Sequence, residues 1–286
     1  MSIYTERKEN MIKLITLDID GTLDNDERTI SPRTQAALRA VEEKGVRLML
    51  CSGRQAPGLR HEAELLKLAN YHGLLASYNG GRIQEATTGE ILFDSSIENG
   101  LARRFLRHLE QWPELSPIVD DGEYIYTTDE NRHKVHDESR NNNLKIKIVP
   151  DIAAAVTWRP VKILTAAPEG ILVPHLADIR EGFEDELSFV QSAPWFYEAT
   201  VKGVAKESAI RQVMEKFDIK AEEIMAFGDA QNDMGMLELA GYAVAMGNAI
   251  PELKQMADEV TLSHNSDGIA ATLERYFQLD KKQLES

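Results

Sequence analysis

Two aspartates separated by one residue end a strongly apolar stretch near the start of the chain. Residues 14–25 read LITLDIDGTLDN, so Asp18 and Asp20 close a predicted buried strand. Side chains alternate along an extended segment, which places both carboxylates on the same side, flanking Ile19. Neighbouring carboxylates repel each other and resist desolvation, so they need a compensating partner, for which a hard divalent cation is well suited. The alternative for this pair alone is that both carboxylates cap the following loop.

Polar residues also follow two other buried runs, VRLMLC (46–51) and IMAFG (224–228). The first is followed by Ser52, Gly53 and Arg54, and the second by Asp229, Asn232 and Asp233. Ligands bind at the carboxyl ends of strands in open parallel sheets, so we expect these residues near Asp18. A hydroxyl and a glycine N–H suit an anion, whereas carboxylates suit a metal ion. The alternatives are a solvated loop arginine and a helix N-cap by Asn232 or Asp233.

A lysine follows the middle part of the chain. Its charge would neutralise these carboxylates and a bound phosphate. Lys206 begins a predicted helix, and Lys202 lies four residues earlier, so spacing alone leaves both candidates open. Cys51 suggests a thiolate nucleophile, but Pro57 stands where the phosphate loop of such an enzyme needs a basic residue. We therefore predict that Cys51 is a buried strand residue.

The composition limits the classes of partner. The chain has 286 residues, 43% of them apolar, and a formal net charge of -15. It can bury a sizeable core, and it lacks the basic surface that nucleic acid or an anionic membrane requires. No apolar run approaches the roughly 18 residues of a membrane span. The single cysteine excludes an internal disulfide and favours a reducing compartment. We expect a cytoplasmic monomer or homodimer with neither a nucleic-acid nor a membrane partner.

Short apolar runs alternate with helical patterns at both ends of the chain. Strands are predicted at 12–18, 46–51, 74–78, 224–228, 242–246 and 258–262. Ser31 and Pro32 begin a helix between the first two strands, and a second helix is expected over 56–69. Strands that alternate with helices predict a doubly wound parallel α/β domain.

The pattern changes in the middle of the chain. Thr88-Gly89 and Asp121-Gly122 each separate two strand-like runs, which predicts hairpins. The polar run 131–143 is predicted to be an exposed loop or a frayed helix end. We expect an α+β insertion over 83–198, a core made of 11–82 and 199–286, and a polar N-terminal extension over 1–10.

Four ordered motifs resemble those of the haloacid dehalogenase-like (HAD) hydrolases. They are D-I-D-G-T (18–22), S-G-R (52–54), Lys206 and G-D-A-Q-N-D (228–233). The N-G-G of 79–81, the large insertion and the segment 247–254 resemble the Cof-type subfamily. The resemblance implies a Rossmann-like core with an inserted α+β cap domain of the IIB kind. Such a cap closes over the site and selects the leaving group.

The resemblance also implies a role for each candidate residue. Asp18 would be the nucleophile that forms an aspartyl-phosphate, and Asp20 the general acid and then the general base. Mg2+ would bind Asp18, the backbone carbonyl of Asp20 and Asp229, supported by Asp233. The phosphate oxygens would be held by Ser52, Lys206, Asn232 and the backbone N–H groups of Ile19 and Gly53. Lys206 is preferred over Lys202 because it follows G-V-A, as the family lysine follows its turn.

The leading hypothesis is therefore a Mg2+-dependent hydrolase of small phosphomonoesters, with a phosphorylated metabolite such as a sugar phosphate as substrate. A phosphomutase of the same family is the nearest alternative, because it would use the same aspartates. A non-catalytic phospholigand-binding regulator is a weaker alternative, since both catalytic aspartates are retained. Asp24, which stands where the family commonly has an apolar residue, receives no role from the sequence.

Overall fold

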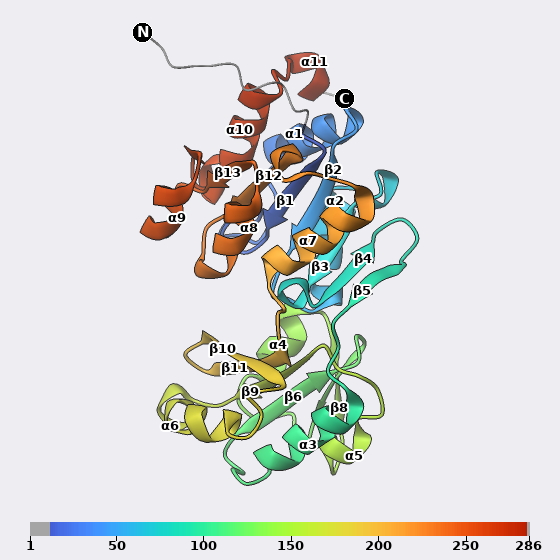
Figure 1. Ribbon diagram of the computed structural model, residues 1–286, viewed down its shortest axis with the longest axis vertical. Coiled ribbons are helices and arrows are strands. Elements are labelled where there is room, and N and C mark those ends of the chain that lie inside the picture. Colours follow the sequence, from blue (N-terminus) through green and yellow to red (C-terminus); the bar gives the residue numbers. More distant parts are fainter. Residues whose placement is uncertain (1–11, 285–286) are drawn as a thin grey trace.

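A central sheet built mainly from the two ends of the chain forms the larger part of the computed structural model, which describes residues 12–284. Its strands are β1 (Leu14–Asp18), β2 (Arg47–Cys51), β3 (Leu74–Ser77), β4 (Arg82–Glu85), β5 (Ile91–Asp94), β12 (Ile224–Gly228), β13 (Tyr242–Ala245) and β14 (Glu259–Val260). They lie in the order β14-β13-β12-β1-β2-β3-β4-β5 (Figure 1). The extension expected over 1–10 lies outside the described residues.

Strand β1 lies at the centre of this sheet, between β12 and β2. Both neighbours are parallel to it, and Asp18 is in register with Cys51 while Leu17 is in register with Phe227. All five residues of β1 and of β12 are buried, as expected for central strands covered on both faces. The carboxyl ends of the three strands therefore meet at one edge of the sheet, and the segments that follow them are brought together.

Helices cover the sheet. They are α1 (Pro32–Glu43), α2 (Arg60–Leu65), α7 (Lys206–Phe217), α8 (Met234–Leu239), α9 (Pro251–Met256), α10 (Gly268–Tyr276) and α11 (Lys281–Leu284).

The predicted start of α1 is confirmed: Ser31 is the N-cap, its hydroxyl accepts the Thr34 N–H, and Pro32 is the first helical residue. The single helix expected over 56–69 is wrong, because a 3-10 turn precedes α2 and Lys67 adopts a left-handed conformation that ends it.

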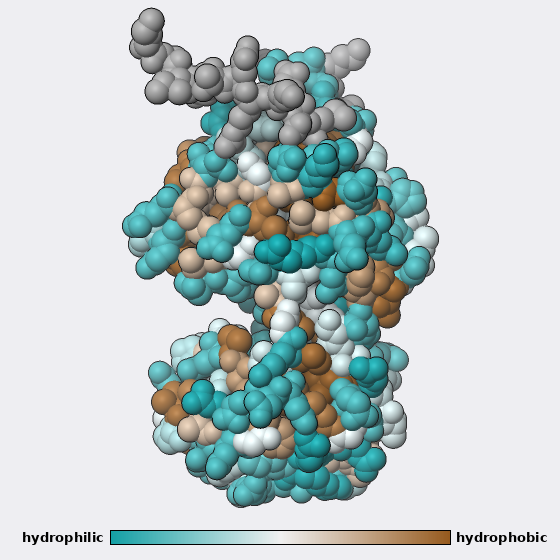
Figure 2. Space-filling model, in the orientation of Figure 1, coloured by the Kyte–Doolittle hydropathy of each residue, from teal (hydrophilic) through white to brown (hydrophobic). Residues whose placement is uncertain are grey.

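The inserted part has its own sheet and core. Its strands are β6 (Ser116–Asp120), β7 (Tyr124–Thr127), β8 (Lys145–Ile148), β9 (Lys162–Ala166), β10 (Leu187–Ala193) and β11 (Phe196–Val201), in the order β10-β11-β9-β6-β7-β8. Its helices are α3 (Asn99–Leu109), α4 (Val135–Asn141), α5 (Ile152–Ala155) and α6 (Glu169–Arg180). Figure 1 shows this part below the central sheet, and Figure 2 shows a waist between the two.

The first predicted hairpin forms, but it does not belong to the insertion that we expected to begin at residue 83. Strands β4 and β5 pair with each other around Gly89, and β4 also pairs antiparallel with β3. The hairpin thus extends the central sheet, and the chain leaves that sheet only after Asp94. The boundary at residue 83 was wrong because a hairpin pattern does not reveal which sheet edge the hairpin joins.

None of the helices between residues 12 and 284 is both long enough and apolar enough to cross a membrane.

Candidate active site

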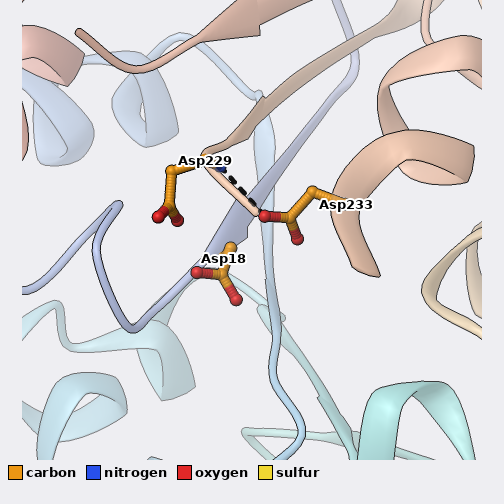
Figure 3. Close-up of side chains that lie close together, drawn as sticks. All are labelled: Asp18, Asp229 and Asp233. Carbon is orange, nitrogen blue, oxygen red and sulfur yellow. Dashed lines mark hydrogen bonds between the residues drawn. The ribbon is translucent and has the colours of Figure 1, made fainter. Parts of the chain in front are cut away.

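Three carboxylates gather where β1 and β12 end. Asp18 is the last residue of β1, and Asp229 and Asp233 follow β12. One oxygen from each lies within 4.8 Å of the others, and Figure 3 shows the three side chains together at the end of the strand. Asp18 and Asp233 are buried and Asp229 is partly buried. This density of buried negative charge requires a cation.

The first cation is the amine of Lys206, at the start of α7. Its Nζ donates to Asp18 Oδ1 and, at 2.7 Å, to Asp233 Oδ1. Lys206 is 1% exposed. Burial alone would lower the pKa of Lys206, but the two aspartates raise it above its ordinary value. Lys202 is exposed. Of the two candidate lysines, Lys206 is therefore the one that meets the carboxylates.

Asp233 also organises the loop that carries Asp229. Its Oδ2 accepts the backbone N–H of Asp229 at 2.9 Å, drawn dashed in Figure 3, and that of Ala230 at 3.0 Å. The capping alternative considered for Asp233 and the site role therefore coincide. Because its other oxygen is bound to Lys206, Asp233 links the loop to the cation.

The turn after β1 supports Asp229 from the other side. Thr22 donates its hydroxyl to Asp229 Oδ1 at 2.9 Å. Gly21 has φ +85°, and a Cβ added there would lie 2.5 Å from Asp229 Oδ2. Burial raises the pKa of Asp229, the Thr22 hydrogen bond lowers it, and Asp233 raises it further. Only glycine leaves room for Asp229 at this position.

We expect Gly21→Ala to remove most of the activity of this site and to lower the free energy of unfolding by about 1–3 kcal/mol. Gly45→Ala is a matched control, because Gly45 has φ +88° but no atom of the part of the chain that the structure describes lies within 4 Å of an added Cβ. The control should show only the backbone strain of about 1–2 kcal/mol. Chemical denaturation and activity assays on both variants measure the difference. Equal activity in the two variants would contradict the role given to Gly21.

The residues expected to hold phosphate line one wall of the same site. Ser52 is 1% exposed, and its Oγ accepts the Arg54 N–H at 3.1 Å. Asn232 donates to Asn79 Oδ1 at 3.2 Å, and a Cβ on Gly53 would lie 3.1 Å from Asn79 Nδ2. Asn79 belongs to the N-G-G motif of 79–81, but that motif predicts no site role for it. Its position two residues after the end of β3, the strand paired with β2, was the signal.

The two residues that follow Asp18 in the chain behave differently. The Ile19 side chain is fully buried, and its carbonyl accepts the N–H groups of Thr22, Leu23 and Asp24, which forms the turn. The Asp20 side chain is 63% exposed and is bound by Arg54. A phosphate contact by the Ile19 N–H and a metal contact by the Asp20 carbonyl stay predictions.

The surroundings of Cys51 argue against its acting as a thiolate nucleophile. Cys51 is fully buried in β2. Burial raises the pKa of its thiol to about 12, Lys206 lowers it, and Asp18 raises it. The thiolate needed for nucleophilic attack is therefore disfavoured.

A cavity of about 880 Å³ lies above these residues and is lined from both parts of the chain. The inserted part contributes Lys162 from β9 and Glu198 from β11, whose charged atoms are 3.1 Å apart. Lys162 Nζ also lies 3.3 Å from the Gly53 carbonyl oxygen. Neither residue was identified from the sequence, where they read as ordinary strand residues.

Helix α4 and the residue after it make another contact between the parts. The Gln55 N–H donates to Asn142 Oδ1 at 2.9 Å, and the Gln55 amide donates to Glu138 Oε1 at 2.8 Å. Glu138 and Asn142 are buried. The prediction of an exposed loop or frayed helix over 131–143 was therefore wrong for these residues, whose polar groups are satisfied by a distant loop.

A family model described as haloacid dehalogenase-like hydrolase matches residues 15–273. The chain belongs to the haloacid dehalogenase-like hydrolases. The likeness of the four motifs to this family is confirmed, together with the expected α/β fold.

Relatives of this haloacid dehalogenase-like hydrolase are similar to it over nearly the whole length of both chains. The 5-amino-6-(5-phospho-D-ribitylamino)uracil phosphatase YcsE of Bacillus subtilis is 30% identical, over 95% of this chain and 98% of its own. A haloacid dehalogenase-like hydrolase from Bacteroides thetaiotaomicron superposes with a TM-score of 0.89 at 32% identity, covering 93% of this chain and 100% of that one. The subclass IIB sugar phosphatase BT4131 superposes with a TM-score of 0.75 at 25% identity, with 93% and 100% covered. The expected enzyme class, a phosphatase of this family, is confirmed.

The residue that follows the site lysine of this haloacid dehalogenase-like hydrolase does not disturb the start of its helix. Glu207 follows Lys206, yet α7 begins regularly, because the Ser208 hydroxyl accepts the Ala205 N–H at 3.0 Å. The Glu207 carboxylate lies over Gly235, where an added Cβ would be 2.0 Å from Glu207 Oε2. Glu207 is thus accommodated without moving the site lysine.

Proposed function

We propose that this protein is a Mg2+-dependent phosphatase that hydrolyses small hydroxylated phosphomonoesters through an aspartyl-phosphate on Asp18. The observation that carries the proposal is the buried Lys206 bound to both Asp18 and Asp233, with Asp18 lining a cavity to which the inserted domain also contributes residues. A buried carboxylate held by a lysine beside an anion-binding wall suits nucleophilic attack on phosphorus.

The donor set fits magnesium. Asp18, Asp229 and Asp233 offer hard carboxylate oxygens within 4.8 Å of one another. Burial raises the pKa of Asp18 to about 8, Lys206 opposes this, and Asp233 adds to it. One lysine thus leaves negative charge uncompensated, which a divalent cation would balance. Asp18 and Asp229 would hold the ion, with Asp233 fixing the loop behind them. When bound, Mg2+ shields the anionic nucleophile from the anionic phosphate.

The chain's own residues supply the remaining chemistry. Asp18 attacks phosphorus while Asp20 gives a proton to the leaving alkoxide, and Asp20 then takes a proton from the water that hydrolyses the aspartyl-phosphate. Ser52, Lys206 and Asn232 would hold the phosphate oxygens. The contacts that Gln55 and Gly53 make with the inserted domain close the site over the substrate and exclude bulk water.

The cavity wall opposite the nucleophile supports a hydroxylated leaving group. Lys162 and Glu198 form a pair there, and Ser192 donates to Glu198 Oε1 at 2.8 Å. These donors and acceptors match hydroxyls better than a hydrocarbon chain. Two relatives have names that describe such substrates, a ribityl phosphate and a sugar phosphate. We therefore propose phosphorylated sugars or polyols as the substrate class.

A panel of phosphorylated sugars and polyols, incubated with the protein in Mg2+, tests this function. We expect phosphate release from some of them, its loss on chelation with EDTA, and its return when Mg2+ is restored. Wild-type release in EDTA would contradict the metal dependence.

The same panel separates the two alternatives. A hexose 1-phosphate converted to its isomer without free phosphate would identify a phosphomutase. If no compound turned over, yet one raised the melting temperature, the protein would be a phospholigand-binding regulator, because such a shift marks binding to the folded state.

A further inference from the structure

All N–H groups of one guanidinium are bound at the mouth of the active site. Arg54 Nε and Nη2 contact Asp20 Oδ2 and Oδ1 at 2.9 and 2.5 Å. Nη2 also donates to Asp24 Oδ2 at 3.1 Å, while Nη1 donates to Glu62 Oε1 at 2.8 Å and to the Gly58 carbonyl at 3.2 Å. A guanidinium has five N–H donors, so none is left over for a substrate phosphate.

The acceptors differ sharply in exposure. The side chains of Asp24 and Glu62 are each 4% exposed, whereas that of Asp20 is 63% exposed. Asp24 Oδ1 and Glu62 Oε2 are buried without a hydrogen-bond partner among residues 12–284. Burial and Glu62 raise the pKa of Asp24 to about 7, against the effect of Arg54. Such a buried pair of carboxyls is costly and is weak evidence for stability, which points to another role.

We propose that Asp24 and Glu62 are positioning residues for the general acid/base Asp20 and act through Arg54. This role rests on the proposed phosphatase function. An exposed aspartate rotates freely on its own, but a planar guanidinium that is anchored on its buried side holds the carboxylate in one orientation. Asp24, which had no role in the sequence, thus becomes one of two anchors.

The loop that carries Arg54 is also held on its other side. The next residue, Gln55, binds Asn142 and Glu138 of the inserted domain. Arg54 is therefore placed by buried groups of the core and by closure of the cap together. A misplaced proton donor matters most when the leaving group needs a proton.

The test compares Glu62→Met with wild type on two substrates, an alkyl phosphate and p-nitrophenyl phosphate, in Mg2+. The parameter is kcat/KM, which covers the steps up to departure of the leaving group. For the alkyl phosphate we expect a loss of at least about tenfold, and for p-nitrophenyl phosphate, which leaves without a proton, a loss below about threefold. Glu62→Gln should retain most activity, because its amide oxygen can still accept from Arg54.

Two further variants separate positioning from folding. Glu42→Met is a matched control, because Glu42 is 3% exposed, has two oxygens without hydrogen-bond partners among the described residues and lies outside the cavity. Its activity should equal that of wild type. In an Arg54→Met background, adding Glu62→Met should cause no further loss, since Glu62 acts through Arg54. If Glu62→Met does not fold, Asp24→Leu replaces it in the same cycle, because leucine removes the other buried acceptor of Arg54.

Equal losses on both substrates, or a further loss in the Arg54→Met background, would overturn the positioning role. Nitrogen-15 NMR of the Arg54 guanidinium tests the anchoring without any activity. Separate Nη signals are expected in wild type and averaged signals in the Glu62 variant. Averaged signals in wild type would overturn the anchoring, whereas absence of turnover in wild type would overturn only the proposed function.

Discussion

Asp18→Asn should reduce phosphate release by at least about ten-thousand-fold, a loss typical of removing a nucleophile. The amide cannot form the aspartyl-phosphate. Cys51, the other nucleophile that the sequence suggested, is buried, and the pKa of its thiol is raised. Steady-state phosphate release in Mg2+ measures the loss.

Folding does not explain this expected loss. Asp18 adds to a buried cluster of negative charge, so the asparagine variant should melt no lower than wild type, with Lys206 still paired to Asp233. Asp185, an exposed aspartate of the inserted domain, provides a control, and Asp185→Asn should retain full activity. A folded Asp18→Asn variant with wild-type turnover would contradict the mechanism.

Lys206→Met should lower the free energy of unfolding by about 3–5 kcal/mol and also remove activity. The methionine fills the space of the lysine stem but leaves Asp18 and Asp233 buried without their cation. Chemical denaturation measures the stability change. Lys216, exposed on the same helix, provides the control, and Lys216→Met should change neither stability nor activity appreciably.

The stability loss of Lys206→Met should depend on pH. Burial already raises the folded-state pKa of Asp18 to about 8, and loss of the cation raises it further, so the folded state binds more protons than the unfolded state. Stability then falls as the pH rises through this range. The deficit relative to wild type should be smaller at about pH 5 than at about pH 8. A deficit independent of pH would show that packing, not charge, accounts for the loss.

The positions of the candidate site residues followed from local sequence patterns. Apolar runs that end in Asp18, Cys51 and Gly228 predicted adjacent parallel strands, and such strands bring their carboxyl ends to one edge. The choice of Lys206 needed the family resemblance, because spacing did not separate it from Lys202. Its burial between two aspartates is a consequence of the fold.

The contacts between distant segments were not predictable in this way. Gln55 meets Asn142 across 87 residues and Glu138 across 83, and nothing in the polar run 131–143 indicates a partner. The anchoring of Arg54 by Asp24 and Glu62 was missed for the same reason, since each carboxylate alone resembles a surface residue. Polar residues that are buried by mutual pairing carry no periodic signal.

Trapping of the covalent intermediate tests the central claim most directly. Borohydride reduces an acyl phosphate to an alcohol, so protein quenched during turnover of a substrate phosphoester should contain homoserine at position 18, identified by peptide mass spectrometry. Substrate-free protein and Asp18→Asn should show no such product. Reduction at another aspartate, or steady turnover with no modified residue, would contradict the assignment of Asp18 as the nucleophile.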